Sequence, residues 1–129
     1  ETQAQFGRVV HLDCHSMKSR GNAMNEDCGA LRPDVVVSDR FGDTADPAIT
    51  ELVAQLFSDA GLKTAINDPY KGAELINRCG DPSKNRHSIQ IELNRGLYMD
   101  EEAFEKKEKG FGALQTQVSE VLQKLVTQI

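Results

Sequence analysis

The sequence lacks any long hydrophobic run, and it is poor in aromatic residues and in cysteine. No apolar stretch approaches the roughly 20 residues that a helix needs to cross a bilayer, which argues against a membrane partner. No signal peptide is visible either. The cysteines, Cys14, Cys28 and Cys79, are odd in number and lack C-x-x-C spacing, which disfavours a disulfide framework and an all-cysteine zinc site. We therefore expect reduced thiols and a cytoplasmic location.

A surplus of basic residues is also absent. The chain has 15 Lys and Arg against 20 Asp and Glu, and the two signs are mixed along it. Proteins that bind nucleic acid present basic faces, so this balance argues against nucleic acid as a partner. No internal repeat or Gly-rich P-loop is found. The 129 residues suit one domain that buries about two thirds of its unfolded surface.

Two segments alternate between apolar and polar residues. Residues 88–95 place Ser88, Gln90, Glu92 and Asn94 on one side and Ile89, Ile91 and Leu93 on the other. Residues 8–15 do the same, with one side bearing Val9, His11, Asp13 and His15. Because side chains alternate across a strand, each segment is predicted to be a strand with one polar face. We expect the two polar faces to look into one cleft.

The remaining segments alternate between strands and helices. A buried strand is predicted over 34–38, a short strand over 62–67 and a short helix over 73–79. The clearest helix begins after the N-cap Asp46 and ends at Gly61. This order predicts a single α/β domain whose sheet is flanked by helices.

The end of the chain is predicted to be helical as well. Asp100 is expected to cap a charged helical segment, which Gly110 and Gly112 interrupt before a last amphipathic helix that ends near Ile129.

Several polar residues follow predicted strand ends, namely His15, Asp39–Arg40, Asn67 and Asn94–Arg95. In α/β sheets, ligands bind outside the carboxyl ends of the strands. We therefore expect these residues to converge on one site.

Each candidate residue also has a structural alternative. A lone histidine such as His15 is more often packed or exposed than a metal ligand, although Asp13 on the same face favours a ligand. Glu92 on a buried sheet either pairs with an arginine or has a function. Cys14 points away from His15, so the two do not form a nucleophile–base pair, and Cys14 is expected in the core.

Four motifs together resemble the second half of the N-formylglutamate amidohydrolase family, over residues 7–125. They are His11-Leu-Asp-Cys-His-Ser-Met17, Asn67-Asp-Pro-Tyr-Lys-Gly72, Gly80-Asp-Pro82, and His87-Ser-Ile-Gln-Ile-Glu-Leu-Asn-Arg95 with Tyr98-Met-Asp100. The resemblance implies a mixed, mainly parallel sheet flanked by helices, similar to the zinc carboxypeptidase or phosphorylase/hydrolase-like fold. It also implies hydrolysis of N-formyl-L-glutamate to formate and L-glutamate, a step of histidine degradation.

The resemblance further implies a zinc-dependent site. His15 would be a metal ligand and Glu92 the catalytic base, and zinc would lower the pKa of its bound water from about 15.7 towards about 7. By position and chemistry, Arg40, Lys71 and Arg95 are candidates to bind the substrate carboxylates or the oxyanion, and Asn67 is a candidate amide donor.

The sequence departs from a complete zinc site in one respect. Catalytic zinc takes three protein ligands, and before His15 only His11 could serve. We favour a chain that is the C-terminal half of a family member roughly twice as long; this predicts unpaired sheet edges and self-association. The alternative is a compact member that uses His11, Asp13 or His87.

Two other functions stay open at this point. One is a related zinc hydrolase that acts on another N-acyl amino acid or a peptide, since loops shape acyl specificity. The other is a non-catalytic α/β module that lacks a complete metal site and acts in binding.

Overall fold

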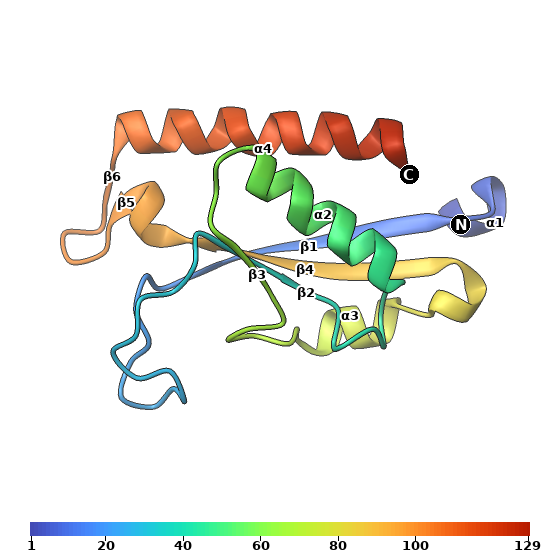
Figure 1. Ribbon diagram of the computed structural model, residues 1–129, viewed down its shortest axis with the longest axis horizontal. Coiled ribbons are helices and arrows are strands. Elements are labelled where there is room, and N and C mark those ends of the chain that lie inside the picture. The colour runs from blue at the N-terminus through green and yellow to red at the C-terminus, as the bar shows by residue number, and fades with distance from the viewer.

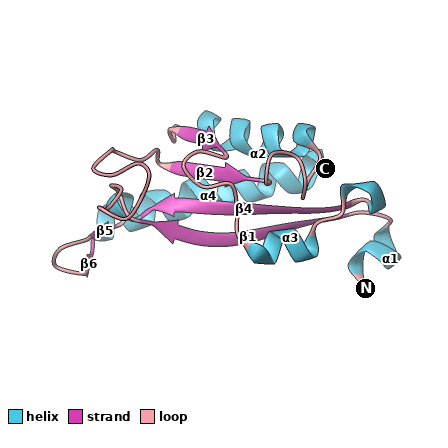
Figure 2. Ribbon diagram, turned by 90° about the horizontal axis from the view of Figure 1, so that it is seen from below, coloured by secondary structure: helices cyan, strands magenta, loops and turns pink.

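A four-stranded sheet organises the protein, whose computed structural model describes residues 1–129. The strands are β1 (Val9–Met17), β2 (Val35–Ser38), β3 (Thr64–Ile66) and β4 (Arg86–Asn94), in the order β1-β4-β2-β3 (Figure 2). β1 is parallel to β4 and β2 is parallel to β3, whereas β2 and β4 are antiparallel. The sheet is therefore mixed and mainly parallel, as predicted.

Helices flank the sheet on both sides (Figure 1). They are α1 (Thr2–Phe6), α2 (Pro47–Asp59), α3 (Glu74–Cys79) and α4 (Glu108–Gln128), and the last is by far the longest. α2 and α4 lie together on one side of the sheet, and α3 lies on the other. None of these helices combines the length and the apolar content that a membrane span requires.

The boundaries of α2 follow from its end residues. The Asp46 side chain accepts a hydrogen bond from the Ala48 N–H at 2.9 Å, so one of the free amides of the first turn is satisfied. Gly61 follows the helix with φ of +87°, a left-handed conformation that costs glycine little. Both ends confirm the prediction for this helix.

The apolar face of the sheet packs against α2 and α4. Ile89 and Ile91 of β4 and Val35 and Val37 of β2 are almost completely buried there. The helices contribute Val53, Leu56, Phe57, Leu114, Val121 and Leu125. Burial of each such side chain contributes about 1.5–3 kcal/mol, and most of the buried apolar side chains of the protein belong to this cluster.

The segment after β4 differs from the prediction. Asp100 does not cap a helix: it ends β5 (Met99–Asp100), which forms a hairpin with β6 (Glu105–Lys106). The Asp100 carboxylate accepts hydrogen bonds from the Glu102 and Ala103 N–H groups of the hairpin turn. The prediction was wrong because an aspartate that caps a turn and an aspartate that caps a helix have the same local sequence pattern.

Gly110 and Gly112 also lie inside α4 and do not interrupt it. A Cβ at Gly110 would lie 2.2 Å from the Leu97 carbonyl oxygen, so the helix passes too close to the backbone there for any larger residue. The prediction was wrong because a glycine in a helix can mark a close approach as well as a break.

The predicted convergence of the strand ends is wrong in part. Because β2 and β3 run opposite to β4 and Ser38 is paired with Gln90, Asp39–Arg40 and Asn67 follow strands that end beside the middle of β4, not beside Asn94–Arg95 (Figure 2). The sequence contains no signal for the direction in which a short buried strand such as β2 pairs.

Candidate active site

The polar faces of β1 and β4 lie side by side. In the parallel register, His15 is paired with Glu92, Asp13 with Gln90 and His11 with Ser88. Residues paired across neighbouring strands point to the same side of a sheet, and the strands are about 4.8 Å apart. The structure therefore brings His15 and Glu92 together on the face opposite to the core.

Glu92 is a buried carboxylate, with only 8% of the residue exposed. Its Oε1 accepts a hydrogen bond from Gln90 Nε2 at 2.7 Å. Burial raises the pKa of Glu92, and the nearby His15, the Gln90 hydrogen bond and Arg95 lower it in part. A carboxylate whose pKa is raised is a better proton acceptor at neutral pH, which suits a general base.

His15 is held by its neighbour on the same strand. Its Nε2 lies 3.0 Å from Asp13 Oδ1, and the imidazole is about half exposed. A carboxylate partner fixes the orientation of an imidazole ring and leaves the other ring nitrogen, Nδ1, available to a ligand. Asp13 Oδ2 is buried and has no hydrogen-bond partner in the chain.

These residues do not fit a complete metal centre. No three His, Cys, Asp or Glu side chains gather into a group that could hold a metal ion. Catalytic zinc is usually bound by three protein ligands. The chain itself thus offers one oriented imidazole and two neighbouring carboxylates.

Glu92 forms part of the wall of a large cavity of about 900 Å³. The opposite walls come from two loops, residues 24–27 and residues 67–73. A smaller pocket of about 280 Å³ also reaches Glu92 and contains Lys18, Arg32 and Arg95. The carboxylate therefore faces a space that can admit a small polar ligand, with cationic groups nearby.

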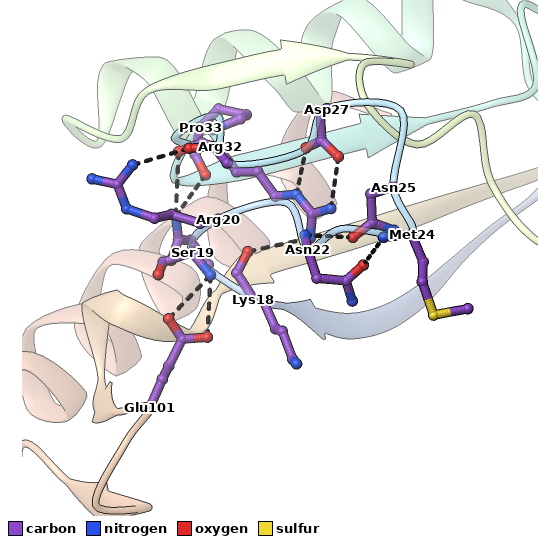
Figure 3. Close-up of polar contacts among 12 residues, drawn as sticks. Lys18, Ser19, Arg20, Asn22, Met24, Asn25, Asp27, Arg32, Pro33 and Glu101 are labelled. Atoms are coloured by element: carbon purple, nitrogen blue, oxygen red, sulfur yellow. Dashed lines mark hydrogen bonds and ion pairs between the residues drawn. The ribbon is translucent and has the colours of Figure 1, made fainter.

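Arg32 joins the two loops that line the cavity. Its Nε and Nη2 donate to the two carboxylate oxygens of Asp27 at 2.7 and 3.0 Å (Figure 3), and its guanidinium lies 4.9 Å from the centre of the Tyr70 ring. The hydrogen bond from Arg32 lowers the pKa of Asp27. Sequence reasoning missed this buried arginine, because an arginine in a polar loop is not distinctive until the fold surrounds it.

The same loop is tied to the hairpin that follows β4. The Glu101 carboxylate accepts a bifurcated hydrogen bond from the Ser19 N–H, at 3.1 Å to each oxygen (Figure 3). The loop of residues 18–33 is thus held at two places, at Ser19 by Glu101 of the hairpin and at Arg32 by contact with Tyr70.

Three of the predicted substrate-binding residues, Asn67, Lys71 and Arg95, line the space around Glu92. Arg95 donates from Nε to Ser16 Oγ at 3.1 Å and from Nη2 to the Ser16 carbonyl at 3.2 Å, which orients the guanidinium. Lys71 belongs to the loop of residues 67–73, and its side chain is exposed.

Asn67 and Arg40 have partners within the chain. The Asn67 amide donates to Asp39 Oδ1 at 2.8 Å and accepts from the Asp39 N–H at 3.0 Å, although the residue borders the cavity. The Arg40 guanidinium donates to the Gly72 carbonyl at 3.1 Å and does not line the cavity. Both residues therefore brace the loop that carries Lys71.

A buried carboxylate, an oriented imidazole and cationic side chains thus lie together on one face of the mixed sheet of an α/β protein. Comparison with known proteins identifies the family of this α/β protein. The family model of N-formylglutamate amidohydrolase matches residues 1–99. The chain belongs to the N-formylglutamate amidohydrolase family, as its motifs predicted.

Individual relatives show how much of the family the chain covers. It is 31% identical to the N-formylglutamate deformylase of Pseudomonas putida over 124 residues, which is 95% of this chain and 45% of the relative. The Pseudomonas aeruginosa N-formylglutamate deformylase is 31% identical over 102 residues, 78% of this chain and 37% of the relative. The chain thus spans less than half the length of the curated relatives that it matches.

A solved structure confirms the fold. The crystal structure of N-formylglutamate amidohydrolase from Ralstonia eutropha JMP134 superposes with a TM-score of 0.79 at 32% identity. The superposition covers 97% of this chain and 45% of that one.

Proposed function

We propose that the chain provides the catalytic base of an enzyme that hydrolyses the amide bond of N-formyl-L-glutamate to formate and L-glutamate, the reaction expected as a step of histidine degradation. The observation that carries this proposal is the buried Glu92, which faces a cavity beside His15 and Arg95. The names of the two curated relatives, N-formylglutamate deformylase, support the substrate.

Glu92 acts in proton transfer. It accepts a proton from a water molecule as the water oxygen attacks the formyl carbon, and it returns that proton to the leaving amine of glutamate. Burial of the carboxylate supports this role because it destabilises the charged form and raises the pKa of Glu92, so the carboxylate takes up a proton more readily than it would in water.

Arg95 and Lys71 bind the two carboxylates of the substrate. A guanidinium matches a carboxylate with two parallel hydrogen bonds, and Arg95 is oriented for this by Ser16. The Asn67 amide is paired with Asp39, and Arg40 does not line the cavity, so we assign both residues to support of the Lys71 loop.

Zinc is part of the proposal only through His15. When bound, zinc supplies a water molecule of lowered pKa. Since one imidazole does not complete a site, we propose that His15 is one ligand and that the other ligands lie outside these 129 residues.

A zinc titration by calorimetry tests whether the chain supplies only one of the zinc ligands. We expect weak or no binding to the folded 129-residue chain, and no further change in the His15→Ala variant. If one zinc binds tightly and His15→Ala abolishes that binding, the chain holds a complete zinc site. This result would contradict the proposal that the other ligands lie outside these residues.

The substrate is tested in a chimera in which these residues replace the matched 45% of the Pseudomonas putida relative. We expect the chimera to hydrolyse the amide bond of formyl-glutamate, and so to release glutamate, faster than it does with acetyl- or succinyl-glutamate. Equal or faster hydrolysis of the longer acyl groups would favour a hydrolase of another N-acyl amino acid. A folded chimera without any hydrolysis would favour a non-catalytic binding module.

A further inference from the structure

Gln90 is a buried amide between Glu92 and the loop of residues 67–73. It is 4% exposed and lies on the polar face of β4, two residues before Glu92. Its Nε2 donates to Glu92 Oε1 at 2.7 Å, and its Oε1 accepts from the Ala73 N–H at 2.8 Å. Two short hydrogen bonds therefore connect the backbone of the loop to the carboxylate.

The Ala73 N–H determines which way the amide of Gln90 points. A backbone N–H can only donate, so the amide oxygen must face Ala73 and the NH2 group must face Glu92. The reverse orientation would set two donors against each other at Ala73 and two acceptors against each other at Glu92. The NH2 group thus donates to a carboxylate, which is among the stronger hydrogen bonds in proteins.

The loop end that holds Gln90 is itself fixed. Gly72 has φ of +102°, and a Cβ there would lie 2.2 Å from Cδ1 of Ile76, a completely buried side chain of α3. Lys71, Gly72 and Ala73 line the same cavity as Glu92. A ligand that contacts this loop is therefore connected to the Glu92 carboxylate through the two hydrogen bonds of Gln90.

We propose that Gln90 is a positioning residue that holds Glu92 Oε1 in place, leaves Oε2 as the reactive oxygen and couples the carboxylate to the Lys71–Ala73 loop. The proposal rests on the proposed function in that Glu92 is taken as the base. The contacts themselves do not depend on the reaction.

Nuclear magnetic resonance of the 129-residue chain at constant pH tests the coupling. In Gln90→Met, which keeps the size of the side chain, we expect the Ala73 amide proton to shift upfield and exchange faster, and the Glu92 carboxyl carbon signal to move. In Glu92→Gln, we expect the side-chain amide signals of Gln90 to move. Unchanged Glu92 and Ala73 signals in Gln90→Met would overturn the proposal.

Gln55→Met is the matched control. Gln55 Nε2 also donates to a carboxylate at 2.7 Å, that of Asp59, but this pair is exposed on α2. The control should leave the Glu92 and Ala73 signals unchanged. Should Gln90→Met fail to fold, Gln90→Glu replaces it: the Ala73 signal should stay while the Glu92 signal moves, and an unmoved Glu92 signal would overturn the proposal.

Kinetics in the active chimera separate this inference from the proposed function. We expect Gln90→Met to lower kcat about ten- to a hundredfold with KM changed less than about twofold, because a displaced base affects the chemical step. A raised KM with unchanged kcat would overturn the positioning role. Full turnover by Glu92→Gln with the spectroscopic coupling intact would instead overturn the proposed function and leave the positioning of Glu92 by Gln90 standing.

Discussion

The two faces of β4 have opposite roles in the same nine residues. Ile89 and Ile91 face α2 and α4 and are almost completely buried among apolar side chains. Gln90 and Glu92 are buried to a similar extent on the other face, yet they contact polar groups and a cavity. Apolar burial stabilises the fold, whereas burial of a carboxylate costs stability. A shift of one position along the strand thus separates residues that stabilise the protein from residues suited to chemistry.

The largest expected effect comes from the apolar face. Ile91→Ala should lower the free energy of unfolding by about 2–5 kcal/mol, because it removes buried methylene groups and leaves a cavity. Ile66→Ala on the edge strand β3, where the isoleucine is 41% exposed, is the matched control and should cost much less. Urea unfolding measures both, and equal losses would show that β4 is not the centre of the core.

A substitution on the polar face should not lower the stability of the protein in this way. Because burial raises the pKa of Glu92 above its value in the unfolded chain, the folded protein binds this proton more tightly. The stabilisation from the protonated form is complete below the unfolded pKa and is lost as the pH rises through the folded pKa. Glu92→Gln should therefore be at least as stable as the wild type at pH 7. Its free energy of unfolding should not fall as the pH rises through the pKa of Glu92 in the folded protein.

Urea unfolding between pH 4 and pH 8 measures that difference. Glu26→Gln, at an exposed glutamate that borders the same cavity, should keep the pH dependence of the wild type. A parallel pH dependence for Glu92→Gln and the wild type would contradict the burial of a charged Glu92.

The smallest effects concern α4, which covers the apolar face. Gly110→Ala should destabilise by about 1–3 kcal/mol, because its Cβ would meet the Leu97 carbonyl. Gly112→Ala meets nothing within 4 Å and should stabilise by about 0.5–1 kcal/mol, since alanine favours a helix. Thermal unfolding compares the two, and the same sign for both would contradict the close contact between α4 and Leu97.

The sequence allowed the faces to be predicted better than the arrangement of the strands. Alternation in residues 88–94 identified both sides of β4, and Asp46 with Gly61 identified the ends of α2, because these signals are local. The antiparallel pairing of β2 with β4 has no local signal, so Arg40 and Asn67 were predicted beside the carboxyl end of β4, whereas they follow strands that end beside its middle.

The candidate site shows the same limit. Glu92 and His15 were identified by motif and then found paired across the two strands. Arg32 and Gln90 were not identified as site residues, since the contacts that connect them to the loop of residues 67–73 are distant in sequence: Tyr70 for Arg32 and Ala73 for Gln90. Such residues can be assigned only after the loops are placed around the sheet.

The polar face of β4 is proposed to carry the catalytic base, Glu92. Formate release from N-formyl-L-glutamate by the chimera tests this role, with Glu92→Gln compared with the control Glu26→Gln. We expect Glu92→Gln to lower kcat/KM by about 10²–10⁴-fold, the usual contribution of a general base, and Glu26→Gln to retain the activity of the unsubstituted chimera. Undiminished formate release by Glu92→Gln would show that Glu92 is not the base.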